Sequence, residues 1–327
     1  MLHVIKKIIP VKYKQYLLLL REYMHDFKMY KKHSSLFKKD TFGKFESEIT
    51  LRYHAIEKGF LHNPIKYRFA KERIEDLILM LKSINLHVYV SRAHIQSALL
   101  NLCKYYEFHV RENIDISDYY KKTDYDTFKK LLFLNHNPIK SHTVKSFFQY
   151  KNSDFRVFSV SRSSVRSFTG EKIPQNTLQE VVDLANHFPS VCNRQPVTVH
   201  VVENINTIKK ILEIQGGLTG YSDHLSQLIV VTSDRNYFYS IGERHQLYID
   251  GGIYLMNLLY SLHYYGIGAC PAHWGMPFNA NGKIKNLLSL KDSEQVVSLI
   301  AIGVPKTTFS TTLSLRKSSK ENLYFHK

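Results

Sequence analysis

The chain has 327 residues, of which 44% are hydrophobic, and its 22 Tyr and 19 Phe supply enough apolar material for about two packed domains. Its composition is not that of a long disordered tract, and no apolar run approaches the ~20 residues of a membrane-spanning helix. The three cysteines, Cys103, Cys192 and Cys270, have neither the paired spacing of a disulfide framework nor that of a structural zinc site, so we expect a reducing cytoplasm.

The formal net charge is +17, and most of the positive excess lies in the first half. Residues 1–150 contain 27 Lys and Arg against 15 Asp and Glu, whereas residues 151–327 contain 18 against 13. The electrostatic field of such an excess of positive charge attracts anions of many kinds. No helix-turn-helix, zinc-finger or RNA-binding signature accompanies it, so we do not expect a nucleic-acid partner. For the basic first thirty residues two interpretations stay open: a helix that packs on its own domain, or peripheral contact with the inner face of an anionic membrane.

Residues 1–150 are predicted to form a mostly α-helical, basic domain of unknown role. Apolar residues recur at helical spacing in residues 71–84 and 91–110. Residues 51–60 read LRYHAIEKGF, which predicts a helix end with Lys58 in the last turn and Gly59 just beyond it. The pattern changes between residues 141 and 155, which places the domain boundary near residue 150.

From there to residue 327, helices and strands alternate. We expect helices at 177–188, 206–214, 242–265 and 281–290, and strands at 197–203, 226–234 and 294–305. This order predicts an α+β domain with one main sheet flanked by helices. The helix at 242–265 is too apolar for an exposed surface, so it is buried either in its own domain or against a second subunit. Residues 266–277 are predicted to be a loop, in which Gly266 stops the preceding helix.

Two short motifs in this half carry many hydrogen-bonding side chains. Residues 161–168 read SRSSVRSF, in which Arg162 and Arg166 offer donors that match a phosphate. A solvated basic surface is the alternative interpretation of that motif. Residues 189–196 read PSVCNRQP, and the two prolines stiffen the ends of a segment that carries Ser190, Asn193, Arg194 and Gln195. Such a rigid polar lip suits a flat ligand rich in heteroatoms.

Together with Gly-Ile-Gly at 266–268, these motifs resemble the FMN-dependent nitroreductase family in order and spacing, over about residues 155–327. The helical first half, with His54-x-x-Glu57-Lys58-Gly59, resembles extensions of nitroreductase-like proteins encoded among surface-polysaccharide genes. The resemblance implies a nitroreductase-like sheet flanked by helices. It also implies a homodimer with the long central helix 242–265 at its interface and with FMN shared between the subunits.

The resemblance also implies a role for individual side chains. The FMN phosphate and ribityl chain would be held by Arg162, Ser163, Ser164, Arg166 and, from the C-terminal segment, Arg316. The flavin ring would be lined by Ser190, Asn193 and Gln195, with Pro271, Ala272 and His273 along its reactive edge. His273 is the one candidate proton donor, and a histidine bonded to backbone is the alternative. Val197 stands where the family often has Trp, and Cys192 is either a redox thiol or a small filler residue.

The implied activity is that of an oxidoreductase that passes electrons from NAD(P)H through FMN to a small-molecule acceptor. An anionic acceptor and a place in surface-polysaccharide metabolism are hypotheses. Two alternatives remain: a flavin-dependent dehydrogenase or oxidase of a biosynthetic intermediate, and a flavin-free binding or scaffold protein on the same fold. The 17 histidines show no ligand spacing, so no metal site is predicted.

Overall fold

The computed structural model describes residues 10–218, 220 and 224–326. The chain forms two compact units, one of residues 1–140 and 312–327 and the other of residues 141–311. The sequence predicted domains with other bounds, 1–150 and 151–327. That these two segments fold independently stays a proposal. No helix of the described ranges has both the length and the apolar character needed to cross a bilayer. The first nine residues of the basic N-terminal stretch lie outside the described residues.

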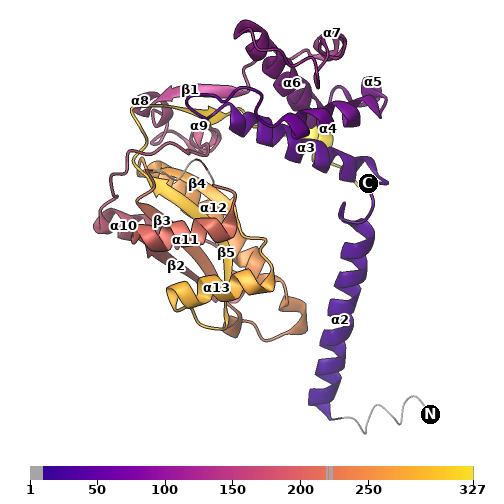
Figure 1. Ribbon diagram of the computed structural model, residues 1–327. Coiled ribbons are helices and arrows are strands. Elements are labelled where there is room, and N and C mark those ends of the chain that lie inside the picture. Colours follow the sequence, from indigo (N-terminus) through magenta and orange to yellow (C-terminus); the bar gives the residue numbers. More distant parts are fainter. Residues whose placement is uncertain (1–9, 219, 221–223, 327) are drawn as a thin grey trace, which may run out of the picture. The chain divides into compact units, whose positions relative to one another are not determined.

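The first unit is built from helices (Figure 1). They are α2 (Val11–His33), α3 (Phe42–Gly59), α4 (Lys71–Lys82), α5 (Leu86–Tyr89), α6 (Ala93–Arg111), α7 (Lys122–Leu131) and α14 (Ser319–Asn322). The core side chains come mainly from α3, α4 and α6, among them Ile49, Leu77 and Leu99, each fully buried. The helices predicted at 71–84 and 91–110 are thus confirmed as α4 and α6.

Gly59 does not lie beyond α3, as the sequence suggested, but is its last residue. A Cβ atom at this position would come 2.1 Å from the ring of Phe69. The glycine is needed for close packing rather than for a left-handed helix cap. The same unit is fastened by Glu46 of α3, which is 5% exposed and bonds to Arg92 Nε at 2.6 Å and to Lys317 Nζ at 3.0 Å. Residue 317 of the C-terminal segment is therefore joined to the first helices of the chain.

The second unit contains an antiparallel sheet of strand order β2-β3-β5-β4. Its strands are β2 (Val197–Val202), β3 (Gln227–Asp234), β4 (Gly268–His273) and β5 (Glu294–Gly303). A separate two-stranded sheet joins β1 (Ile139–Thr143) to β6 (Thr308–Thr312). Every residue of β3 is buried, because helices cover both faces of the sheet.

The helices of this unit are α8 (Val144–Phe147), α9 (Phe155–Ser161), α10 (Gln175–Ala185), α11 (Ile205–Gln215), α12 (Gln246–Tyr264) and α13 (Phe278–Leu288). Side chains of α10 and α12 form the core on one face of the sheet, and side chains of α11 and α13 contribute to the core on the other. The predicted helices and the three predicted strands of this half are confirmed, which gives the expected mixed α and β fold.

The prediction of a loop at 266–277 was wrong, because residues 268–273 form the edge strand β4. An edge strand can hold Pro271, since its outward side needs no backbone donor. Gly266 does end α12, with φ +75° and its N–H bonded to His263 O. Gly268 has another function: a Cβ there would lie 2.8 Å from Pro305 Cγ and 3.1 Å from Gly303 O.

Helix α12 is only half buried in its own unit. Its inner face packs Leu247, Tyr254 and Leu258 against the sheet, and a Cβ at Gly251 would lie 2.7 Å from Val297 Cγ2 of β5. On the outer face, Ile249, Ile253 and Met256 are 53%, 39% and 37% exposed, and no atom lies within 4 Å of a Cβ at Gly252. The apolar surface of α12 that its own unit leaves uncovered is therefore one continuous stripe.

Candidate functional site

The segment with the two arginines leaves α9 and runs beside β4. Asp154 caps α9 by accepting the N–H groups of Arg156 and Val157, and the helix ends at Ser161. Val165 N then donates to Ala269 O of β4 at 2.9 Å. Arg166 Nη1 is buried and has no hydrogen-bond partner among the described residues. A buried guanidinium nitrogen without a partner is stabilised when it donates a hydrogen bond to an anion, and a phosphate is a suitable acceptor.

A histidine that the sequence analysis did not consider fixes the end of α9. His263 of α12 is 2% exposed, and its Nε2 lies 2.9 Å from Ser161 Oγ. Its ring contacts those of Phe147, Phe148 and Phe158. Burial, and then the nearby charges of Arg162 and Lys151, lower the pKa of His263 to about 4. The imidazole is therefore neutral at physiological pH, and it places the residue just before Arg162 against the central helix.

The segment 189–196 is rigid and held under backbone strain. Cys192, Asn193 and Gln195 have φ values of 50°, 54° and 50°, in the left-handed region that non-glycine residues seldom adopt. The Gln195 N–H donates to Ser190 Oγ at 3.0 Å, and Gln195 Nε2 donates to Asn193 Oδ1 at 3.1 Å. The structure thus brings together the three side chains predicted to line a flavin ring, and leaves Asn193 and Gln195 exposed.

Two acidic side chains, Asp250 and Glu243, hold this segment in its strained conformation. Asp250 of α12, 1% exposed, accepts the Val191 N–H and a bond from Gln246 Nε2 at 2.8 Å. Arg194 turns away from the lip and pairs with Glu243, while also donating to Tyr237 O. Hydrogen bonds from Arg194 and from backbone amides lower the pKa of Glu243 to about 2, so the pair stays charged over the physiological pH range. The lip is therefore preorganised before any ligand arrives.

The predicted reactive-edge residues lie on a strand rather than in a turn. Pro271, Ala272 and His273 pair in register with Ile300, Leu299 and Ser298 of β5. His273 is exposed, and its ring lies over Gly275, where a Cβ atom would come within 2.3 Å of the ring. The backbone oxygen of His273 accepts a hydrogen bond from Gln215 Nε2. Residues 161–168, which we call the arginine segment, are bonded to β4 at Ala269. The same strand therefore connects this segment with Pro271, Ala272 and His273. Cys270 within it is buried, whereas Cys192 in the lip is exposed.

Arg316 belongs to the first compact unit, where its Nη1 donates to Ser314 O. Its predicted contact with the phosphate stays a prediction. The described residues contain no group of three or more His, Cys, Asp or Glu side chains arranged to hold a metal ion.

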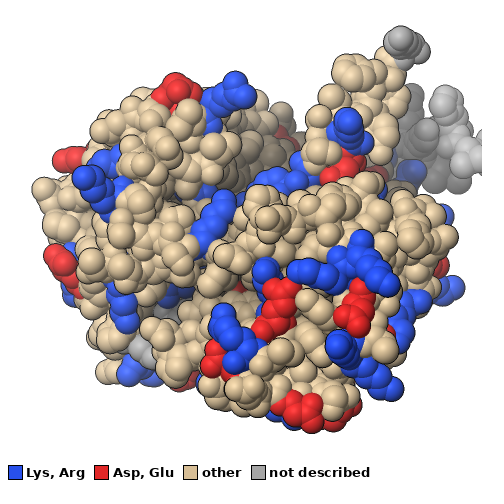
Figure 2. Space-filling model, turned by 90° about the horizontal axis from the view of Figure 1, so that it is seen from above, with Lys and Arg blue, Asp and Glu red and all other residues tan. Residues whose placement is uncertain are grey.

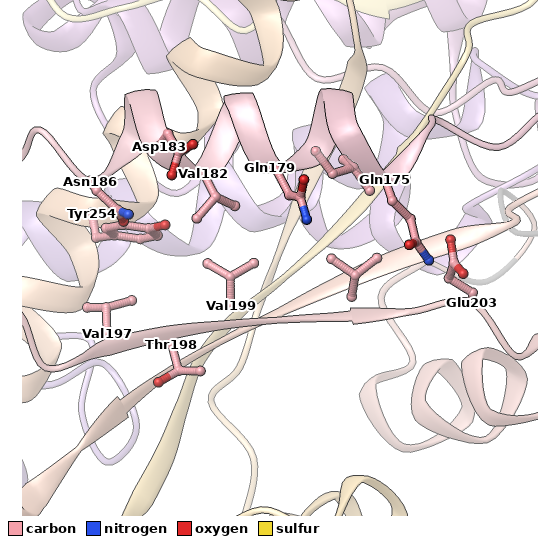
Figure 3. Close-up of a pocket in the computed structure, with 12 residues that line it drawn as sticks. Gln175, Gln179, Val182, Asp183, Asn186, Val197, Thr198, Val199, Glu203 and Tyr254 are labelled. Carbon is pink, nitrogen blue, oxygen red and sulfur yellow. The ribbon is translucent and has the colours of Figure 1, made fainter.

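A cavity of about 750 Å^3 opens at the β2 edge of the sheet, and none of the predicted cofactor residues lines it. Figure 3 shows α10 above β2, with Val182 of the helix and Val199 of the strand pointing toward each other and Thr198 on the far side of the strand. Gln175 and Glu203 lie at one end, and Tyr254 and Asn186 at the other. Because the walls are mixed and carry no cluster of cations, this cavity is a poorer match to a phosphate than the arginine segment.

The basic side chains on the surface do not form one band on the face shown in Figure 2. Lys and Arg lie there in separate groups, several of which adjoin Asp or Glu. This agrees with ion pairs such as Arg68–Asp118, Lys82–Asp124 and Lys129–Glu107 in the first unit.

Comparison with known proteins assigns the second half of the chain to a domain family. The sequence model described as the Nitroreductase family matches residues 160–223 and 223–304, which include the arginine segment, the lip and β4. The C-terminal half of this chain contains a nitroreductase-family domain. Iodotyrosine deiodinase of Hydra vulgaris is 22% identical over 243 residues, which is 66% of this chain and 85% of that protein.

Solved structures similar to the nitroreductase-family domain have low sequence identity. A nitroreductase-like protein of Streptococcus mutans is 21% identical, covers 53% of this chain and 98% of its own, and has a TM-score of 0.46. A proposed NAD(P)H:FMN oxidoreductase of Staphylococcus epidermidis is 20% identical, with 53% and 96% covered and a TM-score of 0.47. A proposed NADH oxidase of Clostridium acetobutylicum is also 20% identical, with 51% and 96% covered and a TM-score of 0.44. Since these scores are below 0.5, the assignment depends on the family match.

Proposed function

We propose that the nitroreductase-family domain binds FMN and acts as an NAD(P)H-dependent oxidoreductase. The observation that carries the proposal is the buried Arg166 Nη1, which has no partner among the described residues and lies in a segment bonded to β4. The family match, and the similarity to a proposed NAD(P)H:FMN oxidoreductase, agree with it. The phosphate and ribityl chain would be held by Arg162, Ser163, Ser164 and Arg166.

FMN, when bound, supplies the electron and hydride transfer that side chains cannot perform. The protein's part is to orient the ring and to exclude competing reactions. Ser190, Asn193 and Gln195 would meet the polar edge of the ring from a preorganised segment, so little ordering is needed on binding. Pro271, Ala272 and His273 would lie along the reactive edge, with the exposed His273 imidazole available to donate a proton to the acceptor.

A homodimer is part of this proposal. Support comes from the outer face of α12, where Ile249, Ile253 and Met256 form an exposed apolar stripe and Gly252 leaves room for close approach. A second copy of the same helix would cover this stripe through a two-fold axis.

The acceptor is proposed to be a small anionic molecule, with a sugar nucleotide or lipid-linked sugar of surface-polysaccharide synthesis as the hypothesis. Its support is the charge of residues 1–150, where 27 Lys and Arg oppose 15 Asp and Glu. We further propose a cytoplasmic protein, since Cys103, Cys192 and Cys270 form no disulfide within the described chain. Its N-terminal region would contact the inner face of the membrane.

The test is the absorption spectrum of the purified full chain, before and after FMN is added, followed by anaerobic addition of NADH or NADPH. We expect flavin bands that bleach on reduction. Arg166→Ala should weaken FMN binding by roughly tenfold or more, as expected for loss of a charged hydrogen bond. Arg156→Ala removes an exposed arginine of the neighbouring helix α9 and should change binding by less than about twofold.

Emission from Trp274, the only tryptophan, reports whether either variant has unfolded this unit. A flat spectrum after FMN addition would refute every flavin-dependent activity and leave a binding or scaffold role. Flavin bands that NAD(P)H does not bleach would favour a dehydrogenase or oxidase of another substrate.

A further inference from the structure

Helix α2 exposes an unusual number of large apolar side chains. In this 23-residue helix, ten of them are at least 44% exposed. They are Tyr13, Tyr16, Leu17, Leu18, Leu20, Tyr23, Met24, Phe27, Met29 and Tyr30. The described residues therefore do not cover this helix, although burying even a few such side chains would stabilise the first unit.

Eight of the ten lie on one face. At about 100° of rotation per residue, the positions 13, 16, 17, 20, 23, 24, 27 and 30 form one stripe along three heptads. We call these eight side chains the α2 stripe. Leu18 and Met29 lie on the opposite face. The stripe includes three positions of each of the first two heptads, which makes it wider than the two-position seam of a coiled coil.

The charges of α2 are arranged around the stripe. Lys12 and Lys28 lie along its two borders and Lys31 follows its last residue, while Glu22 and Asp26 lie toward the far side of the helix. Six Lys and Arg against two acids give the helix a net charge of +4. Lysines at the border of an apolar face can extend their ammonium groups sideways to anions while their stems stay on the apolar surface.

A second exposed apolar site follows directly after the helix. Leu36 and Phe37 are 69% and 58% exposed, and they lie between the pairs Lys31–Lys32 and Lys38–Lys39. Apolar tips flanked by cations are suited to the boundary between lipid chains and anionic headgroups.

We propose that the α2 stripe, with Leu36 and Phe37, lies in the surface of an anionic phospholipid bilayer, parallel to the membrane plane. Four of the eight stripe residues are tyrosines, whose rings prefer an apolar medium and whose hydroxyls need water or a headgroup. A membrane surface meets both needs, whereas a helical dimer would bury those hydroxyls along its seam. Two such helices would also bring together net charges of +4 each. This inference rests on the membrane contact proposed above, and is independent of the flavin site.

The experiment is co-sedimentation of the full chain with vesicles of phosphatidylcholine that contain about one third phosphatidylglycerol, compared with phosphatidylcholine alone. We expect binding to the anionic vesicles that weakens as salt is raised. The variant Leu17→Gln/Leu20→Gln alters the stripe and should bind roughly tenfold more weakly or worse. The matched variant Leu18→Gln/Met29→Gln changes exposed apolar residues on the opposite face and should bind within about twofold of the unaltered chain.

Failure of the unaltered chain to sediment with anionic vesicles would overturn the proposal, as would equal losses in the two double variants. Self-association that is lost only in Leu17→Gln/Leu20→Gln, with no vesicle binding, would show that a second copy covers the stripe instead. The flavin spectrum of the same samples separates these outcomes from failure of the proposed enzymatic function. Because all four altered side chains are exposed, circular dichroism should show an unchanged fold.

Discussion

The buried His263 should make the second unit less stable as the pH falls. The pKa of its imidazole is about 4 in the folded chain and 6.5 as the reference value for an unfolded one. Between these values the unfolded chain binds a proton that the folded chain rejects. The stabilising effect is therefore complete above the reference pKa and is lost as the pH falls toward the folded value.

The size of the loss follows from this difference. From about pH 7 to about pH 5, the unfolded imidazole becomes almost fully protonated while the folded one stays neutral, so the free energy of unfolding should fall by about 2 kcal/mol from this group. Urea unfolding of the flavin-free protein, followed through Trp274 emission, measures the unit that contains His263.

The contribution of His263 is isolated by comparing variants. His263→Gln keeps an amide donor for Ser161 Oγ and removes the titration, so its stability should change with pH by about 2 kcal/mol less than that of the unaltered chain. His187→Gln, at an exposed histidine of the same unit, should keep the full pH dependence. If His263→Gln and the unaltered chain lose the same stability between the two pH values, the imidazole is not the neutral buried group described above.

Two further predictions concern α12. Gly251→Ala should destabilise the second unit by about 1–3 kcal/mol, because the stiff Val297 cannot move away from a Cβ 2.7 Å from its Cγ2. Gly252→Ala, with nothing within 4 Å in its own chain, should leave the urea stability of the monomeric chain unchanged or higher, and equal losses at both positions in the monomer would contradict the packing of this helix. Ile253→Glu places a charge in the proposed dimer face and should shift the chain from dimer to monomer in analytical ultracentrifugation, whereas an unchanged dimer would move the interface elsewhere.

The elements with strong apolar periodicity were predictable from the sequence, and β4 was not. The buried run Leu228–Val231 and the amphipathic α4 each show their own pattern. By contrast, residues 268–273 contain Gly, Cys and Pro, and they form a strand because β5 and Val165 supply its hydrogen-bond partners. Tertiary pairing overrides local preference in such a segment.

In the proposed site, too, some features were predictable from the sequence and others were not. Clustered polar residues and prolines at 189–196 mark the lip in the sequence itself. Its anchors, Asp250 and Glu243, lie about fifty residues farther along the chain, so no local pattern connects them to it. His263 is similar, since its hydrogen bond to Ser161 joins residues 102 positions apart. Only the arrangement of the helices reveals which side chains hold the site in place.

The bond between Lys317 and Glu46 has a consequence for biosynthesis. A ribosome delivers Glu46 early, yet the ammonium group of Lys317 that completes its surroundings is synthesised 271 residues later. The helical unit is thus begun before the nitroreductase-family domain and completed after it. A chain that ends at residue 311 would therefore contain the whole second unit but only part of the first one.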